Sequence, residues 1–213
     1  MYIAPADRTL GEDEWRPFVE AQGFGHLVAS GRGRDLPVVV PTQFVLDGDV
    51  VWLHLVRANP VFEALTENSR VILSVAGDWA FIPSSWKAIN GEDPLVGIPT
   101  TYYAAVQLIG TATVFDEREE AGAVAQILRR QLGAFQPEVD VADPQAAHEP
   151  KLGSILGIRI DIDEVRAKFK YGGNVDAAHR QSVAELLDDR GGPGDAAAAR
   201  QVRRRLSSEG SPE

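Results

Sequence analysis

Short runs of β-branched and aromatic residues, separated by turn residues, fill the first half of the chain. Three such runs, at 25–30, 36–44 and 50–54, are predicted to be strands. The residues Asp-Gly-Asp at 47–49 separate the second run from the third and are typical of a tight β-hairpin. The pattern therefore predicts an antiparallel meander.

The same kind of pattern continues further along the chain. Residues 70–76 and 103–115 are rich in strand-forming side chains, and Gly110 inside the second run indicates a bulge or a barrel corner. Residues 155–162 alternate between apolar and polar side chains, as in a half-buried strand. We expect this late strand to close a barrel.

Helical periodicity appears at both ends of this strand-rich region. Residues 9–12 resemble a capping box, and Trp15 and Phe18 follow at helical spacing until Gly23 ends the pattern. Asp116 precedes apolar positions that recur every three or four residues between 121 and 135. We expect Asp116 to cap this helix, which should cover one flank of the sheet.

The C-terminal part is predicted to be helical. An amphipathic helix follows Asp176, and the Gly-Gly-Pro-Gly sequence at 191–194 ends it. We predict a barrel domain at 1–190 and a helical, polar tail at 191–213. Residues 136–150 contain three prolines and little periodicity, so they are interpreted as a surface loop.

The order of these elements predicts a mainly β fold, a small antiparallel barrel with helices attached, and not a βαβ series. The glycine-rich sequence at 31–35 lacks the spacing of a dinucleotide-binding loop and joins two strands, so it is interpreted as a turn.

Composition narrows the chemistry. The chain of 213 residues has no cysteine, which excludes disulfides, thiolate zinc sites, iron–sulfur clusters and a cysteine nucleophile. It has no apolar run long enough for a membrane span and no signal peptide at its start, so we expect a soluble, cytoplasmic protein without a membrane partner.

Charge argues against nucleic acid as a partner. The net charge is −10, which disfavours binding along a phosphate backbone. A basic cluster near the C-terminus invites a DNA interpretation, but a solvated helix face explains it more simply. The cluster consists of Arg200, Arg203, Arg204 and Arg205.

The segment 50–60 carries the clearest candidate chemistry. A strand ends near His54, and Asn59-Pro60 reads as a helix start with Asn as cap and Pro at the first helical position. Free N–H groups at a helix start bind anions, and Arg57 would add a charge-assisted contact. In the simpler interpretation, Arg57 pairs with a carboxylate and Asn59 only caps the helix.

His54 has three interpretations: a structural hydrogen bond, a hydrogen bond to a flavin, or axial ligation of haem iron. Tyr102 is a candidate for stacking on a planar cofactor, with a place in the core as the alternative. Lys170 is a candidate for neutralising a cofactor anion, with a solvated surface lysine as the alternative. We assign no catalytic residue, because no nucleophilic triad or carboxylate pair is evident.

Several short motifs, in their order and spacing over residues 1–205, resemble the PaiB-type FMN-binding negative transcriptional regulators. The most specific is the His-x-x-Arg-Ala-Asn-Pro run. The motifs are Met1-Tyr2-Ile3, Phe24-Gly25, Pro41-Thr42, His54 with Arg57-Ala58-Asn59-Pro60, Pro83-Ser84-Ser85-Trp86, Ile98-Pro99-Thr100, Val106 with Gly110, and Gly157 with Lys168-Phe169-Lys170.

The resemblance implies an antiparallel FMN-binding split β-barrel, related to pyridoxamine-phosphate oxidase, that forms homodimers with FMN at the subunit interface. The related piperazate synthases use haem instead, with the motif histidine as iron ligand, so haem b bound by His54 is the alternative cofactor. The cofactor-binding residues implied by the motifs and their surroundings are Thr42, His54, Arg57, Asn59, Tyr102, Gln107 and Lys170.

The chain departs from the family pattern after Pro99-Thr100, where Thr101-Tyr102-Tyr103 replaces the usual Trp and Asn. Three functions therefore stay open. FMN-dependent redox chemistry or sensing comes first, a haem enzyme that forms a nitrogen–nitrogen bond comes second, and a non-catalytic transcriptional regulator comes third. The substrate or redox partner is not identified.

Overall fold

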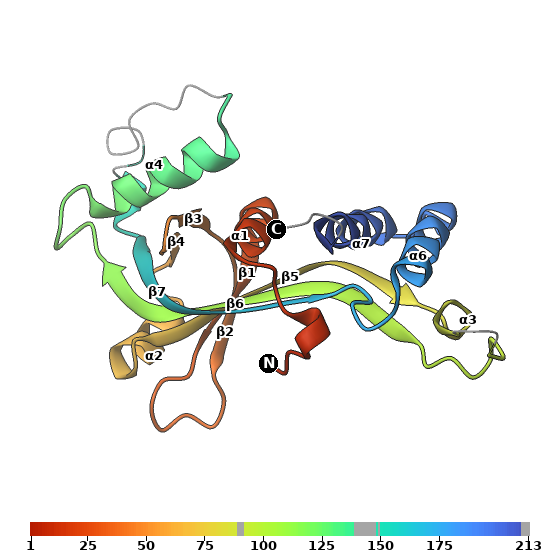
Figure 1. The fold of residues 1–213 in the computed structure, drawn as a ribbon. Helices are drawn as coiled ribbons and strands as arrows, with labels where there is room; N and C mark the ends of the chain where they lie inside the picture. Colours follow the sequence, from red (N-terminus) through yellow and green to blue (C-terminus); the bar gives the residue numbers. More distant parts are fainter. Residues whose placement is uncertain (89–91, 139–147, 149, 210–213) are drawn as a thin grey trace. The chain divides into compact units, whose positions relative to one another are not determined.

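The protein is described here by a computed structural model that covers residues 1–88, 92–138, 148 and 150–209. Within these residues seven strands form one sheet, in the order β2-β1-β5-β6-β7-β4-β3 (Figure 1). In chain order the elements are η1 (Pro5–Asp7), α1 (Glu12–Gln22), β1 (Phe24–Ala29), β2 (Val38–Gln43), β3 (Val45–Asp47), β4 (Val50–Val56), α2 (Val61–Glu67), β5 (Arg70–Ile82), α3 (Ser84–Lys87), β6 (Thr100–Phe115), α4 (Ala123–Phe135), β7 (Ile155–Lys170), α6 (Ala177–Arg190) and α7 (Asp195–Glu209).

The sheet closes on itself. β2 and β3 lie at opposite ends of the strand order, yet only Phe44 separates them in the chain. One residue spans less than about 4 Å, so the two edges of the sheet must meet at this point. Phe44 is almost fully buried, and its N–H donates to the carbonyl of Gly23 at 3.1 Å. The result is a small barrel, as the strand pattern predicts.

The chain forms two compact units. Unit 1 contains Met1–Trp15, Ala76–Ala105 and Ala167–Glu213, and unit 2 contains Arg16–Val75 and Val106–Arg166. The three long strands β5, β6 and β7 each contribute residues to both units. Unit 2 contains the whole of β1 to β4 and is the barrel.

Alternating burial along the strands fills the barrel and leaves a second face for a helix. On β4, Val51 and Leu53 are completely buried, whereas the intervening Trp52 and His54 are half-buried on the opposite face, which α4 packs against. Completely buried side chains of the barrel unit include Leu27, Val51, Leu53, Leu73, Val106 and Ile158.

Unit 1 is built around two packed helices and a buried carboxylate. α6 and α7 lie against each other, and Ala198, Ala199 and Val202 of α7 are completely buried. Asp78 in β5 has a φ of 49°, and the buried positions shift from odd to even residue numbers across it. This is the behaviour of an irregular strand position that redirects the side chains beyond it.

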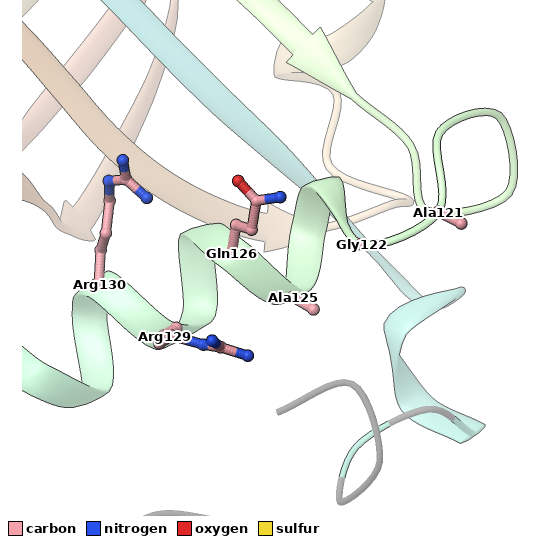
Figure 2. A pocket seen from close by; sticks show the side chains of 6 residues that line it. All are labelled: Ala121, Gly122, Ala125, Gln126, Arg129 and Arg130. Carbon is pink, nitrogen blue, oxygen red and sulfur yellow. The ribbon is translucent and has the colours of Figure 1, made fainter. Parts of the chain in front are cut away.

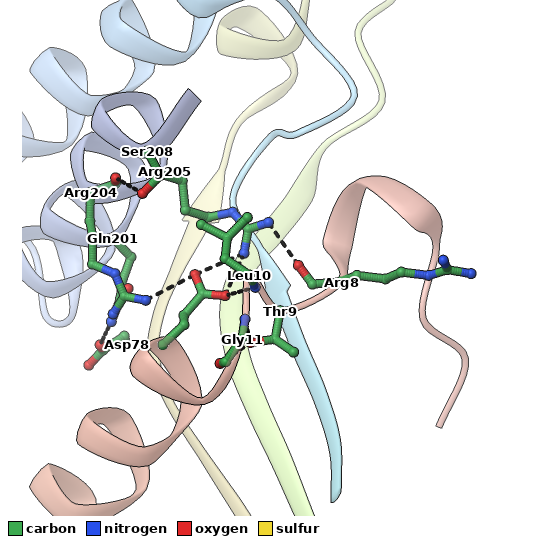
Figure 3. Close-up of polar contacts among 10 residues, drawn as sticks. Arg8, Thr9, Leu10, Gly11, Asp78, Gln201, Arg204, Arg205 and Ser208 are labelled. Atoms are coloured by element: carbon green, nitrogen blue, oxygen red, sulfur yellow. Dashed lines mark hydrogen bonds and ion pairs between the residues drawn. The ribbon is translucent and has the colours of Figure 1, made fainter. Parts of the chain in front are cut away.

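Arg204 and Arg205 lie in an ion-pair cluster of unit 1 (Figure 3), and the centre of that cluster is Glu14. Its carboxylate is 2% exposed, receives Arg205 Nη1 at 3.0 Å and Arg204 Nη2 at 3.2 Å, and accepts the Leu10 N–H at 2.7 Å. Arg205 also donates to the carbonyl of Arg8 at 2.8 Å. The interpretation of the basic cluster as a solvated face is therefore wrong for Arg205, which is buried.

The structure corrects two further predictions, the end of the second strand and the cap of α4. The hairpin at 47–49 is present, but the partner of β4 is the separate strand β3, because the run predicted at 36–44 ends before Phe44. The helix α4 is capped by Glu117, whose carboxylate accepts the N–H groups of Gly122 and Val124, and not by Asp116. Asp116 has a different partner, described below.

The helical predictions at the C-terminus are confirmed. Asp176 caps α6 by accepting the His179 N–H at 2.8 Å, and Gly191 ends it with a φ of 60°. The structure groups the predicted tail with unit 1, because α7 packs against α6. Most of the loop predicted at 136–150 lies outside the described residues. No helix in the described part of the chain could span a membrane.

We expect Glu14→Gln to lower the free energy of unfolding by about 3–5 kcal/mol, because it leaves a buried guanidinium without its counter-charge. Urea denaturation followed by circular dichroism measures the change. The matched control is Arg203→Gln, which removes the exposed ion pair with Asp188 and should cost about 0–1 kcal/mol. Equal effects of the two changes would contradict the importance of the Glu14 cluster.

Candidate functional site

Arg57, the central residue of the predicted anion site, is held by an aspartate. It follows the last residue of β4, and its two terminal nitrogens donate to the two carboxylate oxygens of Asp116 at 2.6 Å each. Its Nε donates to the carbonyl of Gly153 at 2.9 Å. Three of the five guanidinium N–H groups are therefore engaged within the barrel unit.

This pairing shifts the acidity of Asp116. Hydrogen bonds from Arg57, together with the Arg118 N–H, lower the pKa of the Asp116 carboxyl to about 2, although partial burial opposes the shift. The carboxylate in turn raises the pKa of the Arg57 guanidinium. Both groups are charged at neutral pH, and an anion would have to displace Asp116 to take the same face of Arg57.

Asn59 acts as a local cap. Its side-chain oxygen accepts the N–H of Val61 at 3.0 Å, and its carbonyl accepts the N–H of Phe62 at 3.2 Å. Pro60 is the N-cap, so α2 begins at Val61, one residue later than expected. Two of the N–H groups that the sequence offers to an anion, those of Val61 and Phe62, are therefore used inside the turn, and anion binding by Asn59 stays a prediction.

His54 points toward the covering helix of the barrel. Its Nδ1 is hydrogen-bonded to Oε1 of Gln131, a buried residue of α4. Because a glutamine oxygen only accepts, this bond puts the ring proton on Nδ1 and leaves Nε2 with a lone pair. That tautomer suits either a hydrogen-bond acceptor or a metal ligand, so the structure leaves both predicted roles of His54 chemically available.

Thr42 and Gln107 lie on other strands of the barrel unit. Thr42 is buried in β2, and its hydroxyl donates to the carbonyl of the next residue, Gln43, at 3.0 Å. Gln107 is half-buried on β6, on the face opposite to the buried Val106 and Leu108. In the described part of the chain neither side chain is hydrogen-bonded to Arg57 or His54, so their roles as cofactor ligands also stay predictions.

Tyr102 and Lys170 come together in unit 1, where they line one cavity of about 200 Å³. The Tyr102 ring is 1% exposed and packs edge-on against Tyr171, with ring centroids 6.0 Å apart. This burial matches the alternative of a place in the core, and stacking of the ring on a flavin stays a prediction. What Tyr102 offers is its hydroxyl, which has no hydrogen-bond partner among the described residues.

The same cavity contains residues that the sequence analysis missed. Lys87 from α3 lies in its wall, together with Thr100, whose hydroxyl accepts a hydrogen bond from Lys170 Nζ at 2.5 Å. Burial and the charge of Lys170 lower the pKa of Lys87. Thr100 lies in a motif quoted for the family, but nothing in the local sequence connects Lys87 to a residue 83 positions later.

A larger cavity of about 540 Å³ lies beside the start of α4 (Figure 2). Arg129 and Arg130 lie in its wall, but Arg130 also stacks on the Trp52 ring, 4.7 Å from the centroid. The helix N–H groups nearby are already bound by the Glu117 carboxylate. The N–H groups of Val124 and Ala125 are therefore not available to a ligand, and we assign this cavity none.

Metal binding by clustered side chains is not supported. Within the described residues, no group of three or more histidine, aspartate and glutamate side chains is placed to hold a metal ion. Ligation of haem iron by a single histidine, His54, stays a prediction.

Comparison with known proteins shows which family the chain matches. The family model described as "Putative FMN-binding domain" matches residues 1–164. A curated relative, the "Protease synthase and sporulation protein PAI 2" of Bacillus subtilis, is 24% identical over 91% of this chain and 92% of its own.

Solved structures show the same split-barrel fold at low identity. The flavocytochrome Anf3 from Azotobacter vinelandii matches with a TM-score of 0.56 and 21% identity, over 77% of this chain and 69% of its own. The FAD and haem binding protein from Mycobacterium smegmatis matches with a TM-score of 0.56 and 17% identity, over 82% and 78%. The conserved hypothetical protein Rv2991 from Mycobacterium tuberculosis gives a TM-score of 0.57 and 15% identity, over 83% and 94%.

We expect Asp116→Asn to lower the free energy of unfolding at pH 7 by about 1.5–3 kcal/mol, because two charge-assisted hydrogen bonds lose their charge. The pKa of Asp116 is lowered on folding to about 2, so its stabilisation is complete above pH 4 and is lost as the pH falls toward 2. The difference between the wild type and the variant, measured by urea denaturation, should therefore shrink over that range.

The control for this measurement is Asp163→Asn. Asp163 pairs with Arg70 where both side chains are about half exposed, so its loss should cost less than about 1 kcal/mol. A pH-independent difference for Asp116→Asn would contradict the assigned cause.

Proposed function

This chain belongs to the FMN-binding domain family, and we propose that it binds FMN as a homodimer and uses it for redox exchange with a small molecule. The observation that carries the proposal is the family match over residues 1–164 of a split barrel. The family description names FMN, and this favours FMN over the FAD and haem named for the structural neighbours.

The residues present fit an anionic cofactor in part. Arg57, which follows the last residue of β4, is the cation of the family motif in the barrel unit. If a phosphate replaced Asp116 as its partner, both charge-assisted hydrogen bonds would be kept. The flavin itself, when bound, would supply the hydride or electron exchange. The chain itself would bind the phosphate through Arg57 and shield the flavin ring from water. His54 lies three residues before Arg57 in the same motif.

A second protomer would complete the site. We assign the flavin to neither cavity described above: the one of about 200 Å³ is smaller than the roughly 300–1,000 Å³ of ordinary ligand sites, and beside the one of about 540 Å³ the helix N–H groups of Val124 and Ala125 are already bound by Glu117. Two large aromatic side chains of β5, Trp79 and Phe81, are 58% and 51% exposed. Exposed aromatic residues on one strand are typical of a contact surface, and a second copy of this chain is the partner that the family resemblance implies.

The first test is the absorption spectrum of the purified protein. We expect a flavin spectrum, with FMN and not FAD released by acid and identified by mass spectrometry. A Soret band in place of the flavin bands, abolished by His54→Ala, would replace FMN with haem bound by His54. Protein that stays colourless after incubation with FMN, FAD and haem would contradict cofactor binding altogether.

The second test concerns the dimer. We expect sedimentation equilibrium to give the mass of two chains, and the double change Trp79→Glu with Phe81→Glu to give one chain with weaker FMN binding. The control is Leu36→Glu, at an even more exposed apolar residue of the loop between β1 and β2, which should leave both unchanged. A wild-type monomer that binds FMN fully would rule out the shared site.

A further inference from the structure

We propose that unit 1 contains a separate site for a small oxyanion, a carboxylate or a phosphate, bound between Lys87 and Lys170 with help from the hydroxyls of Thr100 and Tyr102. All four residues line the cavity of about 200 Å³. They come from α3, β6 and the end of β7, and they belong to the same compact unit. The site therefore stands on contacts within unit 1 and does not depend on the flavin.

The charge of the cavity is uncompensated. Burial lowers the pKa of the Lys87 ammonium group, and Lys170 is close enough for its charge to lower that pKa further. No carboxylate is among the residues that line the cavity, and no ion pair joins either lysine to an acidic side chain of the described chain. Two like charges held together in this way favour a ligand that carries the opposite charge.

The contrast with three other cations of unit 1, each of which has an acidic partner, strengthens this point. Lys168 is paired with Asp7, Arg190 with Asp195, and Arg205 with Glu14. In a chain with a net charge of −10, acidic partners are abundant. The two lysines of the cavity therefore lack an acidic side-chain partner although such partners are common in this chain. We infer that an exchangeable anion takes this place.

The hydroxyl groups supply directed donors. Thr100 accepts the hydrogen bond of Lys170, which leaves its own O–H to donate elsewhere. The Tyr102 hydroxyl is buried without a partner, and it lies beside Gly172, another wall residue, where an added Cβ would come within 2.3 Å of it. Burial raises the pKa of the Tyr102 phenol to about 12, so the group stays protonated as a donor.

The size of the cavity limits the ligand. A volume of 200 Å³ corresponds to about seven water molecules at liquid density, enough for a small acid or an inorganic phosphate. The wall also contains Ile98, Pro99 and the amide of Asn174, so it offers apolar surface and a further polar group beside the cations. These features fit the anionic end of a small substrate.

Isothermal titration of the purified full chain with sodium phosphate and, separately, with sodium pyruvate tests the site at constant ionic strength. We expect binding of at least one of the two probes in wild type, and at least about a tenfold loss of affinity in Lys87→Gln with Lys170→Gln. Tyr102→Phe should weaken binding to a smaller extent without loss of the fold. The control, Lys151→Gln, changes an exposed lysine of unit 2 and should bind like wild type.

The source of the oxyanion is separated by comparing FMN with riboflavin. If the lysine pair holds a free substrate, the double variant keeps wild-type affinity for both flavins. If the pair instead holds the flavin phosphate, the variant loses affinity for FMN but not for riboflavin, and this assigns the oxyanion site to the cofactor. Absence of phosphate and pyruvate binding, together with unchanged affinity for both flavins in the variant, would overturn the proposal while leaving FMN binding intact.

Thermal unfolding gives an independent measurement. Phosphate or pyruvate should raise the melting temperature of the wild type and not of the double variant, because a ligand stabilises the state that binds it. Without ligand, the double variant should unfold at or above the wild-type temperature, since it removes the repulsion between two ammonium groups. A large loss of stability in the variant would instead identify the lysines as structural.

Discussion

The link through Phe44 is the constraint on which the barrel depends. β2 and β3 are the two edges of the seven-stranded order, and a single residue brings the chain from one to the other. Closure follows from the length of that link, and it removes the exposed edges that an open sheet would present. It also decides which face of β4 is the barrel interior, so Leu53 enters the core while His54 is left on the outside, under α4.

Pairing of charges governs the rest of the molecule. Arg57 and Arg205 each use a carboxylate that is distant in the sequence, and in both pairs the cation is held by several hydrogen bonds. Such pairs specify how distant segments of one unit meet, because leaving either partner alone would be costly. Against this background Lys87 and Lys170 are unusual, since they share a cavity that has no acidic wall residue.

Family membership and local geometry inform different parts of the functional proposal. The match to FMN-binding domains supports a flavin cofactor. The structural similarity to flavin and haem proteins, at low sequence identity, supports the split-barrel fold. Neither explains Tyr102, which lies in the segment where the chain departs from the family pattern, nor the lysine pair beside it. These residues are consistent with a scaffold whose cofactor chemistry is common to the family and whose substrate pocket is particular to this chain.

The sequence alone determined roughly where most strands begin, the helix ends at Gly23 and Gly191, and the cap at Asp176, because each depends on periodicity or on hydrogen bonds between near neighbours. The full lengths of β5 and β7 and the separate strand β3 were decided by the tertiary structure. The sequence also carried the motifs that identify the family. The partners of the candidate site were decided only by the tertiary structure: Arg57 meets Asp116 59 residues later, and His54 meets Gln131 77 residues later. Local sequence patterns cannot predict contacts between residues so far apart in the chain, since the register of the closed barrel and the packing of α4 set which side chains face each other.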